Sequence, residues 1–516
     1  MSSRFFFEVH HPLMMTRLFL FSLCFFSFLG VLHAQHQLPD VMLSKEITRA
    51  DHQSYTTIAF EVPSGIERLS FETEYSQKKE KTVIDLGLID PQGKIVGWSG
   101  GNKSRFTLSA IDATPSYSPH AIDPGQWQLL LGIPNIREGV RATFQAKIYF
   151  SRSLISSNDP PWVNPSLNPQ ARWYRGDLHL HSAHSDGSCQ NASATQEVPC
   201  PAFVIAQKAH ALKLDFIALS DHNAVSQANT LRELQPFFDN LLLMPARELT
   251  SFYGHANLLG STQPFDFRAL GPKTGWVQGL KAFKSGLTPT FASINHPHYP
   301  SGELCMGCGW TFDTSLLDEG LIQGVEVANG EDNGSIFSGL PFWLKQLEQG
   351  RRLTAVAGSD NHHADQDEKT RNYLGRPTNV VYAKALSTQA ITTALMQGHA
   401  YIDFASQGDS TPKRQIELAA TFNHQTFMMG DSIEIGEGAQ DVAIHLRLLN
   451  AQGARARLHT SPLLLAPTEM GLIEHAMELK EFKITPQSGH SWFFLELYDE
   501  TGRLNLMTNP IYFDKK

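Results

Sequence analysis

The sequence predicts an α/β fold class, with a central α/β domain over residues 172–405 between β-sandwich-like domains at residues 36–160 and 406–516. In both flanks, short apolar runs are separated by Pro, Gly and Asp turns, a pattern typical of sandwich strands. In the centre, strand-like runs alternate with helix-like stretches, which indicates a parallel sheet, either open or closed into a barrel. A chain of 516 residues is long enough for several such domains.

The N-terminus has the pattern of a targeting segment. Residues 18–32 read "LFLFSLCFFSFLGVL", with Arg17 before them and the small residue Ala34 after them. This apolar stretch has the length of a signal peptide and is too short for a comfortable bilayer span. We therefore predict a signal peptide over residues 1–34, export to the periplasm or the extracellular medium, and no membrane span after signal removal. An uncleaved anchor is the alternative.

The two flanks carry the apolar and alternating runs that predict strands. Examples are "TTIAFEVP" and "WQLLLGI" before the centre, and "QIELAATFN" and "SWFFLELYD" after it. Residues 156–170, "SSNDPPWVNPSLNPQ", read as a linker and a domain boundary. Trp98 and Trp127 lie in the N-terminal strands, where aromatic side chains can bind a glycan or pack in a core.

Four cysteines follow the predicted signal peptide: Cys189, Cys200, Cys305 and Cys308. In an oxidising compartment we expect two local disulfides, Cys189–Cys200 and Cys305–Cys308. Two alternatives remain for "CMGC", which could be redox-active or supply half of a four-thiolate zinc site. The flanking glycines favour a loop, so a structural bridge is the preferred interpretation.

The charge balance bears on the class of partner. A formal charge of −9 and a pI near 6.2 argue against a nucleic-acid polymer as partner, because a phosphate-backbone binder needs a basic face. A small anionic ester remains possible as substrate, because bound metal ions can reverse the local field.

Histidine and carboxylate side chains follow successive strand-like runs of the central domain. In α/β folds the chemistry collects at the carboxyl ends of parallel strands. The first such end, "GDLHLHSAHSDG", has three histidines and two aspartates in residues 176–187. Across all the runs the candidates are Asp177, His179, His181, His184, Asp186, Asp221, His222, Asn223, Arg247, Glu248, His255, Asn257, Asn295, His296, His298, Glu326, Asn329, Asp360, Asn361, His362 and His363.

Such a collection of acids and imidazoles needs a source of compensating charge. Buried carboxylates are costly unless they are paired, and Arg247 is the only Lys or Arg within these motifs. Divalent metal ions are the simplest solution, and mixed imidazole and carboxylate ligands suit Zn, Mn or Fe. The number of candidates exceeds one tetrahedral site, so we expect two or three ions, with Glu248 as the bridging carboxylate.

The motifs "DLHLHSAHSDG", "LSDHN", "ELTSFYGHANLLG", "INHPH", "GVEVANG" and "GSDNHH" resemble those of the PHP (polymerase and histidinol phosphatase) metallohydrolases, and their spacing resembles the CehA/McbA-type branch. The resemblance covers residues 172–405 and implies a distorted (β/α)7 barrel with up to three metals. It implies three ligand sets: His179, His181, Glu248 and Asp360; Glu248, His255 and His296; Asp186, His222 and His362. Many members of the resembled family have Arg at the position where this chain has His399.

The function expected from this site is metal-dependent hydrolysis by a metal-activated water. Hydrolysis of a phosphomonoester or phosphodiester is the preferred expectation, because most members of the resembled family are phosphoesterases. Hydrolysis of a carbamate, amide or carboxylic ester, and a non-catalytic envelope- or glycan-binding role, are the alternatives. The candidate catalytic residues are Glu248, His184, Arg247 and His298, and further candidates for substrate contact are Asn223, Arg376 and His399. Support of a ligand is the competing interpretation for His184, Arg247, Asn223 and His298. For Arg376 and His399, a solvated surface position is the preferred interpretation of either residue alone.

Overall fold

The structure, a computed structural model, describes residues 38–99, 103–152, 166–263, 265–270, 275–284, 290–302, 305, 307–312, 315–332, 334–404, 413–436, 440–463, 466–486 and 491–515. The predicted signal peptide and most of the predicted linker lie outside the described residues. Residues Pro39–Lys516 cluster as one unit. The helices that the structure describes are each too short or too polar to cross a bilayer.

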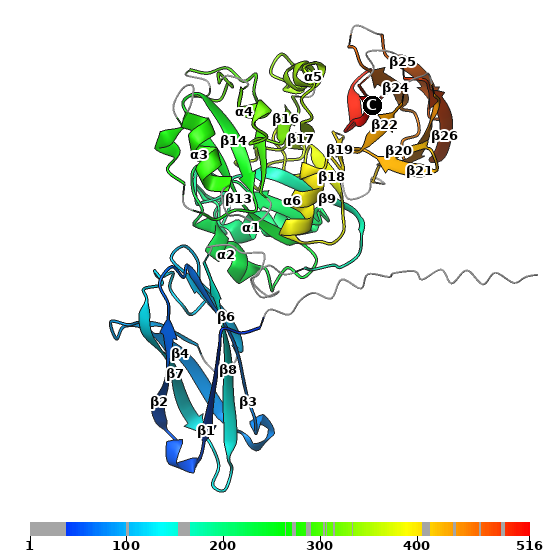
Figure 1. Ribbon diagram of the computed structural model, residues 1–516. Helices are drawn as coiled ribbons and strands as arrows, with labels where there is room; N and C mark the ends of the chain where they lie inside the picture. The colour runs from blue at the N-terminus through cyan, green and yellow to red at the C-terminus, as the bar shows by residue number, and fades with distance from the viewer. Residues whose placement is uncertain are drawn as a thin grey trace, which may run out of the picture. The chain divides into compact units, whose positions relative to one another are not determined.

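The N-terminal region consists of two antiparallel four-stranded sheets, drawn in blue to cyan in Figure 1. Side chains alternate between inward and outward along β1, β2 and β8, as a half-buried strand requires. The inward side chains form one core that includes Phe71 and Trp127. The first sheet has the order β1 (Val41–Ile47), β8 (Ala142–Ser151), β3 (Arg68–Tyr75), β6 (Arg105–Ser109), and the second β2 (Ser54–Val62), β7 (Gly125–Asn135), β4 (Val83–Ile89), β5 (Ile95–Ser99).

The central region is built on a mixed sheet whose strands are largely buried. In order across the sheet they are β17 (Thr354–Gly358), β16 (Gly324–Asn329), β15 (Phe291–Ile294), β14 (Gly254–Leu259), β13 (Leu242–Ser251), β12 (Phe216–Leu219), β9 (Arg172–Leu180), β18 (Thr378–Ala383) and β19 (Ala400–Asp403). The helices around it are α1 (Ala202–Ala211), α2 (Gln227–Leu234), α3 (Gly275–Lys284), α4 (Ser315–Asp318), α5 (Leu340–Glu348) and α6 (Thr388–Met396).

The predicted α/β class and its (β/α)7 barrel are wrong: the described residues are mostly β, and their strand pairing closes no barrel. Only Phe252 and Tyr253 separate β13 from β14, which is too short for a helical crossover, so these strands pair antiparallel. β14 and β15 are also antiparallel, as are β18 and β9. The sheet then continues from β18 through β19 to β28 (Leu504–Thr508) instead of returning to β17.

The C-terminal region extends the central sheet and adds another sheet. β28 is followed in order by β27 (Trp492–Tyr498), β24 (Arg455–Thr460) and β25 (Thr468–Leu472), and β29 (Ile511–Lys515) pairs with both β27 and β22 (Ser432–Ile435). The separate sheet has the order β21 (Gln425–Met428), β20 (Gln415–Phe422), β23 (Val442–Leu449), β26 (Met477–Ile484). Hydrogen bonding between β19 and β28 therefore crosses the boundary predicted at residue 405.

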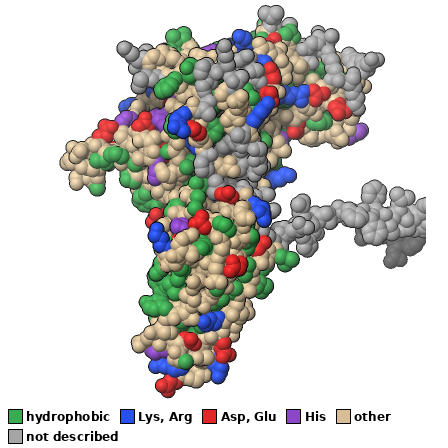
Figure 2. Space-filling view, turned by 60° about the vertical axis from the view of Figure 1, so that its left-hand side comes forward, with side chains coloured by type: hydrophobic (Ala, Val, Ile, Leu, Met, Phe, Trp, Pro, Cys, Tyr) green, Lys and Arg blue, Asp and Glu red, His purple; other side chains and the backbone are tan. Residues whose placement is uncertain are grey.

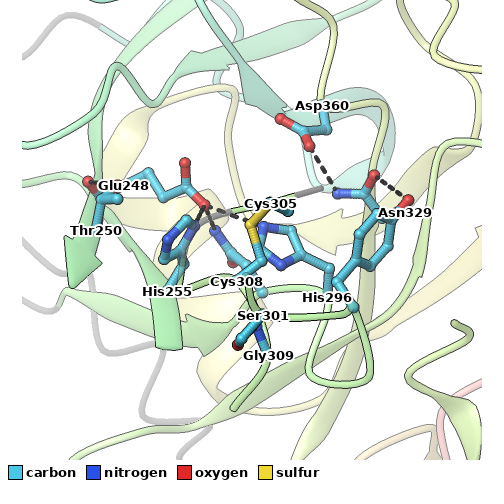
Figure 3. Close-up of a disulfide and its surroundings, with 12 residues drawn as sticks. Glu248, Thr250, His255, His296, Ser301, Cys305, Cys308, Gly309, Asn329 and Asp360 are labelled. Atoms are coloured by element: carbon cyan, nitrogen blue, oxygen red, sulfur yellow. Dashed lines mark hydrogen bonds and ion pairs between the residues drawn. A yellow bond between two sulfur atoms is a disulfide. The ribbon is translucent and has the colours of Figure 1, made fainter. Parts of the chain in front are cut away.

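Two disulfides are present, Cys189–Cys200 and Cys305–Cys308. The first joins the end of β11 (Glu197–Pro199) to β10 (Ser188–Gln190), which pair as a small hairpin after β9. The second lies in the loop between β15 and β16 and approaches the histidine cluster described below (Figure 3).

Candidate metal centre

The ends of neighbouring strands bring the predicted ligands together. His179 lies in β9 and His181 follows it, Glu248 lies in β13, and His255 lies in β14. His222, His296, Asp360 and His362 follow β12, β15 and β17. The backbone of Asp360 donates to the His179 carbonyl, and that of His181 donates to the Asn361 carbonyl. These bonds join the loop after β17 to the end of β9 although the two strands do not pair.

Glu248 is the centre of this cluster. Its Oε1 lies 3.5 Å from His179 Nε2, 3.1 Å from His255 Nδ1 and 3.3 Å from His296 Nε2. Its Oε2 lies 3.6 Å from His181 Nε2 and 2.8 Å from His222 Nδ1. The carboxylate is buried, so both of its oxygens are directed at imidazoles rather than at water. One side chain thus connects five histidines that come from four separate segments of the chain.

Asp360 and Asp186 complete the cluster on either side of His181. Asp360 Oδ1 lies 3.0 Å from His181 Nε2 and 3.3 Å from His179 Nε2. Asp186 lies 3.4 Å from His362 Nε2 and 3.7 Å from His222 Nε2. The side chain of Asp186 is exposed, whereas His179 and His181 are buried. The cluster therefore has a closed end at His179 and an open end at Asp186.

Four groups of side chains place their ligand atoms within 4.8 Å of one another. They are His179, His181 and Glu248; His179, His296 and Asp360; His255, His296 and Cys308; and His181, Asp186, His222 and His362. All nine residues predicted as metal ligands occur in these groups, and Cys308 is an addition. The chain therefore positions His, Asp and Glu groups that can bind a metal ion.

The spacing in the cluster is that of ligands around an ion. Atoms that bind one tetrahedral zinc lie roughly 3.4 Å from each other, since each lies about 2.1 Å from the metal. Most of the nitrogen–oxygen distances above fall between 3.0 and 3.7 Å. These are longer than the charge-assisted hydrogen bonds that directly paired groups would form, at about 2.8 Å.

Several buried polar atoms in the cluster have no hydrogen-bond partner among the described residues. They are His255 Nε2 and His296 Nδ1, together with His179 Nε2, His181 Nε2 and Glu248 Oε2, which lie at the ion-pair distances given above but without hydrogen-bond geometry. A buried polar atom left without a partner costs about 1–3 kcal/mol. Several such atoms in one place therefore indicate a binding site for a group from outside the chain. A divalent cation fits this donor set of imidazole nitrogens and carboxylate oxygens.

Mutual repulsion and burial govern the charges of the histidines. Burial lowers the pKa of His181 to about 4, with a further contribution from the neighbouring His362. Burial also lowers the pKa of His179, but Asp360, Glu326 and Glu248 outweigh it and hold that pKa well above its usual range. Burial raises the pKa of Glu248, yet the histidines around it hold the pKa well below its usual range. The acids are therefore ionised, and the imidazoles divide unequally between neutral and charged forms.

Side chains behind the cluster fix the orientation of the rings. His179 Nδ1 lies 2.9 Å from Glu326 Oε1, which directs Nε2 toward Glu248. His222 Nδ1 lies 2.6 Å from the Thr250 hydroxyl, and His362 Nδ1 lies 2.9 Å from the Asp360 carbonyl. Both of these rings therefore direct Nε2 toward Asp186. A partner of this kind selects the tautomer and orientation of a ligating histidine.

Amide side chains hold the carboxylates in turn. Asn295 donates to Glu248 Oε1 at 2.9 Å, and Asn329 donates to Asp360 Oδ2 at 3.2 Å. The sequence pattern had placed Asn295, Glu326 and Asn329 at strand ends without a role for any of them. Only their hydrogen bonds assign one, because no spacing in the sequence shows which ring a carboxylate will contact.

Local backbone conformation also serves the cluster. Non-glycine residues with positive φ include Asn223 (52°), His296 (27°) and Asp360 (52°), which all lie just beyond the strand ends of the site. Such conformations are costly and persist where the surroundings enforce them. Gly358, at the end of β17, has no room for a Cβ, which would collide with His179 and Glu326. A larger residue there would displace a ligand and its supporting carboxylate.

Three of the predicted catalytic residues lie outside this cluster. His184 bonds through its two ring nitrogens to Ser226 at 2.8 Å and Thr230 at 3.3 Å. Arg247 follows the alternation of β13, so it faces away from Glu248, and it donates to the Gln263 carbonyl. His298 is exposed and contacts the Ser338 carbonyl at 2.9 Å. Of the four predicted catalytic residues, only Glu248 is at the centre.

The other predicted substrate contacts are engaged elsewhere. Arg376 pairs with Glu331 at 2.7 Å, and His399 lies 3.1 Å from Asp431. Asn223 exchanges hydrogen bonds with the backbone of Thr250, at 2.9 Å and 3.0 Å, and so holds the end of β13 rather than a substrate. On the face drawn in Figure 2, the described Lys and Arg side chains are interspersed with Asp and Glu.

Comparison with known proteins adds no relative to this description: no family model matches the chain, and no curated protein matches it significantly.

Proposed function

We propose that this protein is a metal-dependent hydrolase, most simply a phosphoesterase acting on a small phosphomonoester or phosphodiester. The observation that carries the proposal is the Glu248 carboxylate, buried and within 3.6 Å of imidazole nitrogens from His179, His181, His222, His255 and His296. We expect two or three divalent ions of Zn, Mn or Fe in this cluster.

When bound, such ions would make a water nucleophilic near neutral pH and stabilise the charge that develops on the ester. The residues of the chain would hold them in fixed geometry: Glu248 between its histidines, Asp360 beside His179 and His181, and Asp186 beside His222 and His362. Glu326, Asn295 and Asn329 would keep those ligands oriented. Loss of an outer partner of this kind typically costs 10- to 100-fold in metal affinity or activity.

The unequal exposure of the cluster indicates where an ester would enter. His179 and Glu248 are buried, whereas Asp186 is exposed and His222 and His362 are partly exposed. Substrate would therefore approach through the side lined by Asp186, and the buried side would exclude water. An ester that must reach this opening is a small molecule or an exposed group of a larger one.

A second candidate, hydrolysis of a carbamate, amide or carboxylic ester on the same site, is favoured by one specific observation. The cations predicted to contact an anionic substrate, Arg247, Arg376 and His399, bond instead to Gln263, Glu331 and Asp431. A neutral ester would not need them. A phosphate ester would have to be recognised through the ions themselves.

The test is a substrate panel with purified full-length protein that has been loaded with Zn²⁺, Mn²⁺ or Fe²⁺. An aryl phosphate, a phosphodiester, an aryl carbamate and an aryl carboxylic ester are assayed against wild type and Glu248→Gln. Glu417→Gln is the matched control, because Glu417, on β20, is a partly exposed partner of Arg447 and lies outside the cluster. Hydrolysis of a phosphate ester that requires Glu248 but not Glu417 supports the first candidate. Hydrolysis of the carbamate or carboxylic ester alone supports the second, and no hydrolysis by a metal-loaded protein contradicts both.

A further inference from the structure

The loop between β15 and β16 brings a buried sulfur to the histidine cluster. Cys308 is only 2% exposed, and its sulfur and one ligand atom each of His255 and His296 lie within 4.8 Å of one another. Figure 3 shows the disulfide beside the two imidazole rings and the Glu248 carboxylate. Each of the two rings also has a buried nitrogen without a hydrogen-bond partner in the described part of the chain, His255 Nε2 and His296 Nδ1.

The loop backbone holds Cys308 in this place independently of the disulfide. The amide of Gly309 donates to the Ser301 hydroxyl at 3.1 Å, and that of Trp310 donates to the Pro297 carbonyl at 3.0 Å. Gly307 has φ +85°, and a Cβ there would collide with the backbone of Ser251 and Phe252. The loop therefore packs tightly against the β13–β14 hairpin, and breaking the disulfide leaves Cys308 beside the same histidines.

The two sulfurs of the bridge differ in access. Cys305 is partly exposed, whereas Cys308 is buried against the cluster. Thiol–disulfide exchange depends on which sulfur the attacking thiolate can reach. A reductant from solution therefore reaches Cys305 and releases Cys308.

We propose that the Cys305–Cys308 bridge controls the ligand set of the His255–His296 metal position, so that Cys308 becomes a metal ligand when the bridge is reduced. This proposal rests on the proposed function only in that a divalent ion occupies the cluster. In the disulfide form, the imidazoles of His255 and His296 are the protein donors at this position. In the reduced form a thiolate joins them, and thiolate favours Zn²⁺ over harder ions such as Mn²⁺.

The redox step balances with a small dithiol as reductant. One of its thiolates attacks Cys305 Sγ and forms a mixed disulfide, and the sulfur–sulfur electron pair leaves on Cys308 Sγ. The second thiol of the reductant then attacks the mixed disulfide, and Cys305 leaves as a thiol. The reductant becomes a disulfide, and the two electrons reside on the two cysteines, with Cys308 as the thiolate that binds the ion.

Metal binding and reduction are then coupled in both directions. If reduction tightens Zn²⁺ binding, bound Zn²⁺ must make the bridge easier to reduce by the same factor. A tenfold tighter affinity corresponds to a reduction potential about 30 mV more positive in the zinc-loaded protein than in the metal-free protein. This shift is measured in wild type by equilibration with a dithiol buffer, without any variant.

The direct test uses Co²⁺ as a visible substitute for the native ion in full-length protein. Cys305→Ser leaves Cys308 unpaired, and Cys308→Ser removes the sulfur at the cluster. We expect the near-ultraviolet thiolate-to-cobalt absorption in reduced wild type and in Cys305→Ser. We expect none in disulfide-bonded wild type, and none in Cys308→Ser whether or not reductant is present. A protein in which Cys189 and Cys200 are both replaced by Ser is the matched control and should behave as wild type.

The outcomes separate this proposal from the proposed function. If cobalt gives its visible ligand-field bands but no thiolate band in Cys305→Ser or in reduced wild type, Cys308 is not a ligand and the redox proposal is wrong. The metal centre would stand in that case. If no variant gives visible cobalt bands, no divalent ion binds in the cluster and both proposals fall. An identical midpoint potential with and without Zn²⁺ would also overturn the coupling.

Discussion

The N-terminal sheets and the histidine cluster both bury carboxylates, and they differ in the charges that lie beside them. Asp112 is 1% exposed and lies 2.8 Å from Arg68 and 2.6 Å from Arg232. Glu248 is equally buried and has imidazoles as its charged neighbours. A guanidinium is always protonated, whereas a buried imidazole readily loses its charge.

The two carboxylates therefore differ in whether permanent cations within the chain balance their charge. Burial raises the pKa of Asp112, but Arg232 and Arg68 outweigh this effect and lower it to about 2, so the ion pairs are complete within the chain. At the cluster, burial and His362 lower the pKa of His181 to about 4, so that ring is neutral near pH 7 and supplies no positive charge. Its one unprotonated ring nitrogen then has a lone pair that can bind a cation. Asp112 is thus paired with two permanent cations, Arg68 of β3 and Arg232 of α2. In the cluster, burial is outweighed by the carboxylates, which hold the pKa of His179 well above its usual range and that of His362 at about 9. The positive charge there therefore belongs to imidazolium groups, whose protons a bound metal ion would replace.

The largest expected effect comes from removing the shared carboxylate of the cluster. Glu248→Gln should abolish hydrolysis and release bound metal, with a loss greater than the roughly 100-fold that removal of an outer partner can cause. Steady-state assays and elemental analysis of the same samples check both parts. Full activity with a full metal load would refute the bridging role of Glu248.

The next largest effect should occur in the N-terminal sheets and leave the metal unchanged. Asp112→Asn removes the buried carboxylate that pairs with Arg68 and Arg232, which should destabilise the region by about 3–5 kcal/mol. Hydrogen exchange of the β3 and β6 amides measures that loss. Metal content should equal that of wild type, and a variant that lost metal as well would break the distinction between the two regions.

A smaller effect is expected behind the cluster, at Glu326, which contacts His179 Nδ1 at 2.9 Å. Glu326→Gln should lower metal affinity about 10- to 100-fold, because the His179 ring loses the carboxylate that orients it. Competition with a chromophoric chelator gives the affinity. Glu331→Gln, outside the cluster, is the control, and an unchanged affinity in Glu326→Gln would remove Glu326 from the support of the site.

Acid should weaken the N-terminal sheets through Asp112. Its pKa is about 2 in the folded protein against about 3.9 unfolded, so the ionised form is the one that the fold stabilises. The stabilisation is present above about pH 4 and is lost as the pH falls toward 2, and it amounts to about 2–3 kcal/mol. Hydrogen exchange as a function of pH should show this loss in wild type and not in Asp112→Asn. The same slope in both proteins would assign the acid sensitivity to another group.

The smallest effects should come from histidines that the structure places outside the cluster. His184→Ala and His399→Ala remove rings bonded to Ser226 and Asp431, and we expect hydrolysis and metal content within about twofold of wild type, since a tenfold change would require a loss of about 1.4 kcal/mol at the site. His222→Ala is the comparison within the cluster and should lose both. A large loss in His184→Ala would restore its predicted catalytic role.

Much of the site could be predicted because metal ligands leave a local pattern in sequence. Histidine and aspartate after apolar runs marked the ends of β9, β12 and β17, and those ends do converge. The barrel prediction failed because such runs do not report strand direction. The two residues between β13 and β14 show that these strands must be antiparallel, and this short connection was the available signal.

Individual side chains were harder to assign, for physical reasons that differ. Arg247 and Glu248 are adjacent in a strand, and adjacent strand residues face opposite sides of the sheet. This alternation could have excluded Arg247 from the site that contains Glu248. The ring of His184 is held by hydrogen bonds to Ser226 and Thr230, and these residues lie near His184 only in the folded chain. Cys308 was interpreted as half of a disulfide, with a redox-active pair or half of a four-thiolate zinc site as the alternatives. Nothing in "CMGC" itself indicates that His255 and His296 lie beside it.

Elemental analysis decides whether the cluster is a metal centre. The protein is purified with excess divalent metal and then dialysed into chelator-treated buffer. We expect two or three equivalents of a divalent transition metal per chain in wild type and in Asp112→Asn, and a clear loss in Glu248→Gln. Less than one equivalent in a folded wild-type protein would contradict the metal centre, because the buried acids and histidines would then be stable without bound cations.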